Sequence, residues 1–288
     1  MTSVGFDPVA FKNQQRGTWD AISAGWQSEQ AAFERGAAAA TARLLELAGI
    51  RQGHRVLDVG TGIGEPALTA AGLTGASGQV LGVDLSPRMI EAARARGAGV
   101  PGLEFQVGDV DSLELPAAGF DAVLSRWGLM FAVDRVAAFR SLGRVLAPGG
   151  VLAAAVWSAP EQAPMMSLGF RALAERLDMP PPPPGMPGPF SMSDPEQVAG
   201  ELVAAGFTEV SVTEGDLRFP FRSGDEYVAF NKAVTPPSMK AALAEKFGSD
   251  DDPETWAAVR SATEPYASPD GSVVLPAKTR YLRAVRPR

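Results

Sequence analysis

The sequence contains no cysteine, and only one of its 288 residues is a histidine, His54. Disulfide bonds, zinc–thiolate centres and cysteine nucleophiles are therefore excluded, as is a zinc site made of several histidines. We accordingly expect no bound metal. The formal net charge is −7 and no basic cluster stands out, whereas a nucleic-acid-binding protein needs a positive surface to displace counterions from phosphates. Nucleic acid is thus not an expected partner.

Long hydrophobic runs are also missing. No stretch of about 18 uninterrupted apolar residues occurs, so we expect no membrane insertion. Residues 1–20 lack the charged-then-apolar pattern of a signal peptide, and the expected location is the cytoplasm. Hydrophobic residues make up 45% and charged residues 20% of the chain, which is typical of a globular protein with a buried core. The sequence leaves open whether the chain forms a homodimer.

Short apolar runs alternate with helical segments through the first half of the chain. The expected strands span residues 55–60, 79–85, 103–109, 120–126 and 151–157. Helices are expected between them at 66–72, 87–97 and 133–146. This alternation predicts an α/β fold with right-handed crossovers and a parallel sheet that carries helices on both faces. Two later candidates, 208–221 and 277–285, would be the final strands of that sheet.

Helical segments and one proline-rich loop flank this alternation. The expected helices span 29–48, 165–177, 195–206, 226–234, 237–247 and 253–264. Five consecutive prolines, Pro180–Pro184, can form neither a helix nor an interior strand. We expect this loop to be an exposed cover, and leave open whether it is a mobile lid or a rigid spacer.

Glycines and carboxylates follow the ends of consecutive expected strands. The first strand leads into Asp58-Val-Gly60-Thr61-Gly62-Ile-Gly64, the second ends at Asp84 and the third at Asp109. Ligands of open α/β sheets bind beyond the carboxyl ends of the strands, and glycines let the backbone approach them closely. A carboxylate at Asp84 can accept both ribose hydroxyls, and one at Asp109 can accept the amine of adenine. These features predict a nucleoside site. Asp58 could contact the ligand or bond the loop backbone, and the second role is favoured.

Two nucleoside cofactors compete for this site. The segment Gly62-Ile-Gly64-Glu-Pro-Ala67 matches the G-x-G-x-x-A pattern of dinucleotide sites, and Asp84 has the spacing of their ribose-binding acid. However, Glu65 opposes a pyrophosphate, and Pro66 removes one N–H donor from the helix start. A cationic sulfonium is compatible with an acidic loop. S-adenosylmethionine is therefore favoured, and an NAD-dependent oxidoreductase is the less favoured alternative.

Five segments resemble, in order and spacing, the class I S-adenosylmethionine-dependent methyltransferases. They are VLDVGTGIGEPAL, VLGVDLSPRMIEAAR, FQVGDVDSL, FDAVLSRWGLMF and LGRVLAPGGVLAAAVW. The ubiquinone/menaquinone C-methyltransferase-like group, which includes bacterial natural-product enzymes, is the most similar. The resemblance implies a doubly wound, mostly parallel seven-stranded sheet with an antiparallel last strand. It also implies S-adenosyl-L-methionine as cofactor, S-adenosyl-L-homocysteine as product, and a small-molecule methyl acceptor. An apolar, aromatic pocket would favour a lipophilic or aromatic acceptor.

The resemblance also implies a domain organisation and cofactor contacts. Residues 1–288 would form one methyltransferase domain, with cap helices in 1–40, the cofactor-binding core in 41–157, a cap insertion with the proline-rich loop in 158–205, and the completion of the sheet with substrate-side helices in 206–288. The implied cofactor contacts are Gly60, Thr61, Gly62, Asp84, Leu85, Met89, Asp109, Val110, Ser125 and Arg126. Arg126 could instead pair with a structural acid such as Asp20.

The acceptor site is less constrained by the sequence. Candidate contacts are Trp19, Trp26, Trp127, Met130, Phe131, Tyr227 and Phe230, several of which could equally pack in the core. No catalytic residue is assigned, because His54 begins the first strand at the end away from the ligand. Any general base would be Asp, Glu, Tyr or water, and oxygen, carbon and nitrogen acceptors all stay open. An alternative is a protein of this fold that binds the cofactor without methylating.

Overall fold

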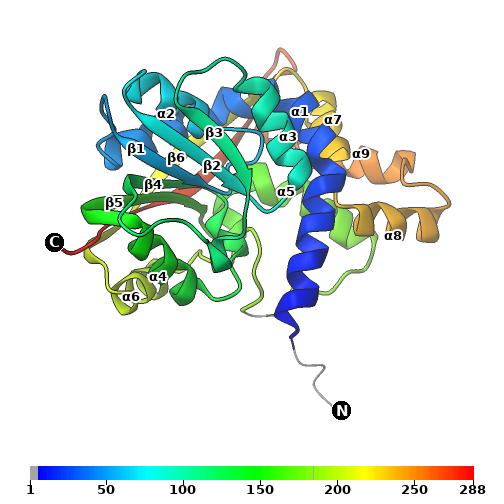
Figure 1. Ribbon diagram of the computed structural model, residues 1–288. Coiled ribbons are helices and arrows are strands. Elements are labelled where there is room, and N and C mark those ends of the chain that lie inside the picture. The colour runs from blue at the N-terminus through cyan, green and yellow to red at the C-terminus, as the bar shows by residue number, and fades with distance from the viewer. Residues whose placement is uncertain (1–5, 184) are drawn as a thin grey trace.

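The structure is a computed structural model that describes residues 6–183 and 185–288. Its seven strands form one sheet in the order β3-β2-β1-β4-β5-β7-β6, with helices on both faces (Figure 1). The strands are β1 (Arg55–Val59), β2 (Gln79–Asp84), β3 (Leu103–Val107), β4 (Phe120–Arg126), β5 (Leu146–Trp157), β6 (Thr208–Phe221) and β7 (Val273–Val285). β7 runs antiparallel to both β5 and β6, while β1 to β5 pair in parallel. The predicted doubly wound sheet with an antiparallel last strand is confirmed.

The central strands are buried on both faces, which explains their nearly unbroken apolar sequences. Leu57 of β1, Leu124 of β4 and Ala153 of β5 are all fully buried. Helices α2 (Ala67–Thr74), α3 (Pro87–Arg96) and α4 (Arg135–Val145) provide the crossovers. The strand order reverses between β1 and β4, so the crevice at their carboxyl ends is where a ligand is expected.

Helix α1 (Pro8–Leu47) is much longer than the predicted helix over 29–48. It begins at Asp7, whose Oδ1 accepts hydrogen bonds from Val9 N at 2.9 Å and Ala10 N at 3.1 Å. The first half of α1 contains Gly17 and Gly25, which disfavour an isolated helix. Tertiary packing compensates, because a Cβ at Gly25 would lie 2.0 Å from Ala233 O. The glycine thus permits close contact with the helix that contains Ala233.

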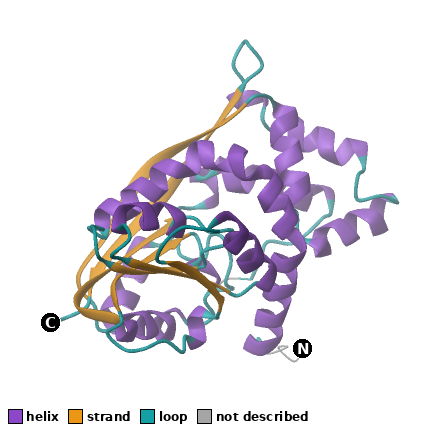
Figure 2. Cartoon of the chain, turned by 45° about the horizontal axis from the view of Figure 1, so that its top comes forward, coloured by secondary structure: helices purple, strands orange, loops and turns teal. Residues whose placement is uncertain are grey.

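The remaining helices are α5 (Pro164–Arg176), α6 (Pro195–Ala204), α7 (Gly224–Val234), α8 (Pro237–Phe247) and α9 (Pro253–Ser261), close to their predicted spans. Figure 2 shows purple helices on both sides of the orange sheet, and in Figure 1 helices α8 and α9 lie on the side of the molecule away from β5. Short 3₁₀ helices span Val110–Ser112, Leu129–Phe131, Pro160–Gln162 and Glu264–Tyr266. Among the residues that the structure describes, no helix is long and apolar enough to cross a membrane.

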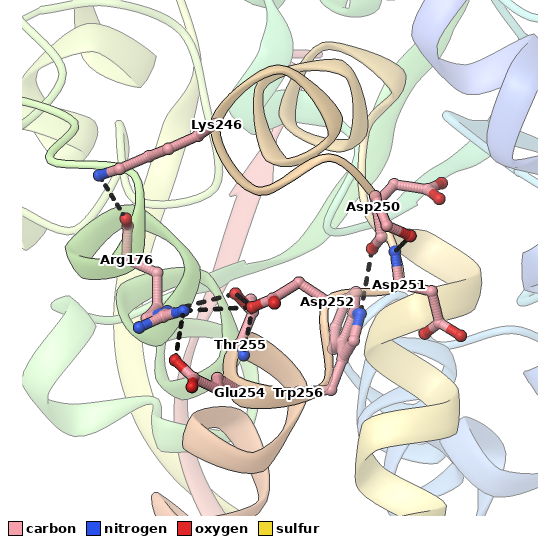
Figure 3. Close-up of polar contacts among 9 residues, drawn as sticks. Arg176, Lys246, Asp250, Asp251, Asp252, Glu254, Thr255 and Trp256 are labelled. Carbon is pink, nitrogen blue, oxygen red and sulfur yellow. Dashed lines mark hydrogen bonds and ion pairs between the residues drawn. The ribbon is translucent and has the colours of Figure 1, made fainter.

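A polar cluster joins three of these helices (Figure 3). Arg176, at the end of α5, donates to Asp252 Oδ2 at 3.1 Å and to Thr255 Oγ1 at 3.2 Å. Lys246 of α8 donates to the Arg176 carbonyl at 2.8 Å, and the Arg176 guanidinium lies 4.6 Å from the centre of the Phe247 ring. Helices α5, α8 and α9 are therefore fastened to one another at the end of α5.

The proline-rich loop connects α5 to α6. Residues 180–183 are exposed, and Pro184, the last of the five prolines, lies outside the described residues. Further along, Gly188 N donates to Met130 O at 3.0 Å and Ser191 Oγ donates to the same carbonyl at 2.7 Å. The loop therefore returns to the carboxyl end of β4, where the candidate site lies.

Candidate functional site

A cavity lies at the carboxyl ends of β1, β2, β3, β4 and β5, and residues from one side of α1 form its outer wall. The predicted residues that line it are Gly60, Thr61, Gly62, Asp84, Leu85, Met89, Asp109, Val110, Arg126, Trp19, Trp26, Trp127, Met130 and Phe131. It therefore brings together nearly all of the predicted cofactor contacts and most of the predicted acceptor contacts.

The loop after β1 is shaped by a close backbone contact with the loop after β4. Gly60 has φ +68°, and a Cβ there would lie 2.8 Å from Gly128 Cα. Gly60 N and Thr61 N both donate to Val83 O, at 2.8 and 3.0 Å. Ser125 Oγ donates to Val59 O at 2.8 Å and is fully buried. The prediction that Ser125 lines the cavity is wrong, because its side chain supports the loop from behind.

Asp84 lies at the end of β2 and faces the cavity. Its Oδ2 accepts from Gly62 N at 2.8 Å and its Oδ1 accepts from Ser86 N at 2.9 Å. Burial raises the pKa of this carboxyl, although the two backbone N–H groups oppose that shift. Each oxygen keeps a lone pair that can accept a further hydrogen bond. The glycine loop thus fixes the orientation of Asp84.

Asp109 follows β3 and is paired with a residue that the sequence analysis missed. Lys12 Nζ lies 2.7 Å from Asp109 Oδ1 and 2.7 Å from Asp111 Oδ2. Asp111 N also donates to Asp109 Oδ1, at 3.0 Å. The first turns of α1 are therefore attached to the end of the cavity that Asp109 lines.

Asp58 is fully buried and does not line the cavity. Its Oδ2 accepts from Ala67 N at 3.1 Å, at the start of α2. Burial raises the pKa of Asp58 to about 7, against the opposing effects of the Thr61 side chain, the Ala67 N–H and the Arg126 charge. Asp58 therefore ties the loop backbone to α2, which is the interpretation that the sequence favoured.

Arg126 lines the cavity, but its guanidinium is held by α1. It forms a two-bond ion pair with Glu34, with Nη1 2.9 Å from Glu34 Oε2, and Nη1 also donates to Thr41 Oγ1 at 2.8 Å. The alternative prediction that Arg126 pairs with Asp20 is wrong. Asp20 instead accepts from Ser86 Oγ at 2.5 Å and from Arg88 N at 3.1 Å.

Aromatic rings form the rest of the wall. Trp26 and Phe33 have ring centres 5.1 Å apart, Phe33 and Trp127 are 5.5 Å apart, and Trp127 stacks on Trp157 at 4.2 Å. Trp127 has φ +59°, a strained conformation for a bulky residue, and its Nε1 donates to Thr279 Oγ1 at 3.2 Å. Stacking and this hydrogen bond hold the ring in place.

Two predicted acceptor contacts lie outside the cavity wall. Tyr227 is fully buried; its hydroxyl accepts from Gly169 N at 3.0 Å and donates to Met165 O at 3.2 Å. Burial raises the pKa of Tyr227 to about 12, which removes it as a general base. Phe230 packs behind Trp26 and Phe33, at ring distances of 5.7 and 6.0 Å. Both predictions fail because these side chains complete the core beneath α1.

Several wall residues were not predicted. They are Lys12, Gln15, Gln30, Phe33, Glu34, Ile63, Glu65, Gly108, Gly128, Trp157, Met166 and Pro189, together with Val59. The residues of α1 recur at three-, four- and seven-residue intervals, which is the spacing of one helix face. In the sequence, Trp19 and Trp26 already show this spacing. Continuing it toward Lys12 and toward Phe33 would have identified the other wall residues of α1.

The residues present fit S-adenosylmethionine. Glycines lie where a ligand would need close approach, and Asp84 and Asp109 stand at the ends of neighbouring strands with oxygens facing the cavity. Gly62 has no heavy atom within 4 Å of the position of an added Cβ, which leaves space beside the loop for a ligand.

Comparisons with known proteins agree with this fit. Residues 57–154 match the family model described as a methyltransferase domain. The ubiquinone/menaquinone biosynthesis C-methyltransferase UbiE of Pseudomonas fluorescens is 32% identical over 191 residues, which are 58% of this chain and 70% of that protein. UbiE of Pseudomonas putida is 37% identical over 142 residues, covering 46% of this chain and 56% of the relative. The match thus spans little more than half of that relative.

Two solved structures share the fold across most of the chain. The [4+2]-cyclase SpnF has a TM-score of 0.61 at 21% identity, covering 96% of this chain and 97% of the other. Phosphoethanolamine N-methyltransferase 2 of Haemonchus contortus, solved with S-adenosyl-L-methionine, has a TM-score of 0.59 at 19% identity, covering 100% of this chain and 62% of the other. With the matching domain model and the UbiE relatives, the chain belongs to the class I S-adenosylmethionine-dependent methyltransferases, in the ubiquinone/menaquinone C-methyltransferase-like group, whose cofactor is S-adenosylmethionine.

Proposed function

We propose that this protein transfers the methyl group of S-adenosylmethionine to a small, lipophilic or aromatic molecule. The observation that carries the proposal is the division of one continuous cavity into two parts. Carboxylates and glycines line the part at the ends of β1 to β3, and aromatic rings line the part between α1 and the ends of β4 and β5. A nucleoside cofactor suits the first part and an apolar acceptor suits the second.

Each cofactor-side residue has a role in this proposal. Gly60, Thr61 and Gly62 would pack on the methionine portion, and Asp84 would accept the ribose hydroxyls. Leu85 and Met89 would contact the adenine ring, with Asp109 and Val110 at its edge. These assignments are supported by the presence of all eight residues in the lining of one cavity.

Positioning would provide most of the rate enhancement. When bound, the cofactor would supply an activated methyl group: an electron pair of the acceptor would bond to the methyl carbon, and the electron pair of the methyl–sulfur bond would stay on sulfur. The aromatic wall would hold the acceptor in line and exclude water, and such orientation is worth roughly 7–11 kcal/mol. Arg126 and Glu34 neutralise each other and would contribute to the wall rather than to proton transfer. A proton that the acceptor loses would pass to water.

The test uses the purified full chain, S-adenosylmethionine labelled in its methyl group, and a small-molecule extract. Label is expected to move into an organic-soluble product in the wild type and to stay with the cofactor in Asp84→Ala. The S-adenosylhomocysteine affinity of the wild type is measured in parallel by calorimetry. Tight binding with no transfer to any compound would contradict the proposal.

That outcome would favour the alternative of a cofactor-binding protein that does not methylate. The alternative is supported by one comparison, since the solved structure with the TM-score of 0.61 is described as a [4+2]-cyclase. At 21% identity that likeness is one of fold. Mass spectrometry of the same extract would separate the two functions, because a cyclisation leaves the mass of its substrate unchanged while methylation adds one CH₂.

A further inference from the structure

The stacked indoles of Trp127 and Trp157 form one side of the acceptor part of the cavity. Trp127 follows β4, and 9% of its surface is exposed. Its ring lies almost parallel to that of Trp157 on β5, with the ring centres 4.2 Å apart and the planes at 7°. The two rings form a flat double layer, so a change in the tilt of Trp127 would alter the shape of the acceptor part.

Thr279 of β7 connects these two indoles by hydrogen bonds. Its Oγ1 accepts from Trp127 Nε1 at 3.2 Å and donates to the carbonyl oxygen of Val156 at 2.8 Å. Because Val156 directly precedes Trp157, a single hydroxyl ties the Trp127 ring to the backbone that carries its stacking partner. Thr279 is fully buried and does not line the cavity. It can therefore affect a ligand in the cavity only through other residues.

The side chain of Trp127 depends on its surroundings for its orientation. Its φ of +59° is a conformation that a bulky residue adopts only where its neighbours enforce it. The backbone is held by the bond from Trp127 N to Ala155 O at 2.8 Å, but that bond does not set the rotation of the indole. Without the Thr279 hydroxyl, the indole N–H would be buried without an acceptor, which is costly. The ring would then turn toward another acceptor or toward water.

We propose that Thr279 is a positioning residue of the acceptor site, whose hydroxyl holds the Trp127 indole in the orientation that admits a flat aromatic acceptor. This inference rests on the proposed function only in calling the ligand an acceptor, since the orientation of the ring can be measured without methyl transfer. If the ring is free to turn, only a fraction of the molecules present the competent wall, and the apparent affinity for the acceptor falls by that fraction. Asp84 and Asp109 lie at the ends of β2 and β3, so the affinity for the cofactor should not change.

The test compares two substitutions of Thr279. Thr279→Val keeps the branched shape and removes the hydroxyl, whereas Thr279→Ser keeps the hydroxyl. Binding of the probe 2-naphthol to the full chain saturated with S-adenosylhomocysteine is measured by calorimetry. Thr279→Val should bind 2-naphthol about tenfold more weakly than the wild type, as expected for the loss of one hydrogen bond. Thr279→Ser should stay within about twofold of the wild type, and all three proteins should bind S-adenosylhomocysteine equally.

The indole proton of Trp127 reports the hydrogen bond directly. The chain has five tryptophans, and in protein prepared with isotope-labelled tryptophan the indole signal that is missing from Trp127→Phe identifies Trp127. Loss of the hydrogen bond should move this signal upfield in Thr279→Val. The signal should keep its wild-type position in Thr279→Ser.

Thr235→Val is the matched control. It removes a buried hydroxyl that donates to Asn231 O at 2.6 Å at the end of α7, and Thr235 does not line the cavity. It should bind 2-naphthol as the wild type does.

Four results would overturn the inference. They are wild-type affinity for 2-naphthol in Thr279→Val, an equal loss in Thr279→Ser or in Thr235→Val, an unmoved indole signal in Thr279→Val, and no binding of 2-naphthol by the wild type. A parallel loss of S-adenosylhomocysteine affinity in Thr279→Val would also overturn it, because Thr279 would then support the fold as a whole. The proposed function fails separately, by absence of label transfer.

Discussion

The two parts of the cavity are built in different ways. The cofactor part consists of strand ends and tight loops, where Gly60 meets Gly128 and backbone N–H groups orient Asp84. The acceptor part consists of side chains from α1 facing Trp127 and Trp157. Main-chain geometry is sensitive to any added atom, whereas a wall of side chains can be altered one residue at a time. The comparison predicts that substitutions in the first part impair folding and cofactor binding, and those in the second change selectivity.

The largest effect is expected from Gly128→Ala. The added Cβ would lie 2.9 Å from both Gly60 Cα and Val59 O, and backbone on both sides leaves it no room. We expect a loss of about 3 kcal/mol or more in the free energy of unfolding, measured by urea denaturation. Gly17→Ala is the control, since nothing lies within 4 Å of its Cβ position on α1 and it should gain about 0.5–1 kcal/mol. Equal stability of the two variants would break the comparison.

A second prediction concerns the pH dependence of stability. The folded-state pKa of Asp58, about 7, lies above its unfolded value of 3.8, so the folded state binds the extra proton. The corresponding stability is fully present below the unfolded pKa and is lost as the pH rises through the folded pKa. Between about pH 5.5 and 7.5 the wild type should lose about 2 kcal/mol relative to Asp58→Asn. Identical pH profiles in denaturant titrations would show that Asp58 does not titrate in this range.

Asp84→Asn tests whether the cofactor part determines cofactor affinity. An amide accepts through one oxygen only and presents its NH₂ to a backbone donor. The affinity for S-adenosylhomocysteine, measured by calorimetry, should fall about tenfold or more. The free energy of unfolding without ligand, measured by urea denaturation, should fall less than in Gly128→Ala. An equal loss of stability would mean that Asp84 acts on folding rather than on cofactor binding.

The smallest effect is expected from Lys12→Met. This variant tests the one described contact between α1 and the carboxylates of the cofactor part. Lys12 belongs to α1, yet it contacts the cofactor part through Asp109 and Asp111. All three side chains are about one-fifth exposed, at 17%, 21% and 18%, so the bridge is worth about 0.5–1 kcal/mol. The affinity for S-adenosylhomocysteine should fall two- to fivefold, less so at high salt. An unchanged affinity would confine α1 to the acceptor part.

The sheet could be predicted from the sequence because each buried parallel strand is a short, nearly unbroken apolar run. The apolar runs around Leu57, Leu124 and Ala153 required helices on both faces, and the glycine loop and acids at their ends located the cofactor part. Strand β5 still begins earlier than predicted, at Leu146. Local patterns were sufficient here because the relevant residues follow one another along each strand.

The acceptor part was harder to predict because its contacts are distant in sequence. The pairing of Arg126 with Glu34 joins residues 92 positions apart. Ser125, next to the cofactor part, and Tyr227, next to the acceptor part, are polar residues that turn into the core and bond backbone groups, and periodicity does not reveal that direction. The first half of α1 has weak helix propensity, and its contact with Ala233 is tertiary.

Helix α1 has one further consequence, for how this protein can diversify. Its 40 residues form one uninterrupted helix, so Lys12, Trp19, Trp26 and Gln30 keep a fixed rotational phase relative to one another. Inserting one residue between Trp19 and Trp26 would turn everything before it by about 100° relative to everything after it. A substitution on this face therefore leaves the other side chains in place, whereas a change in chain length is better accommodated in a loop such as the one that follows α5.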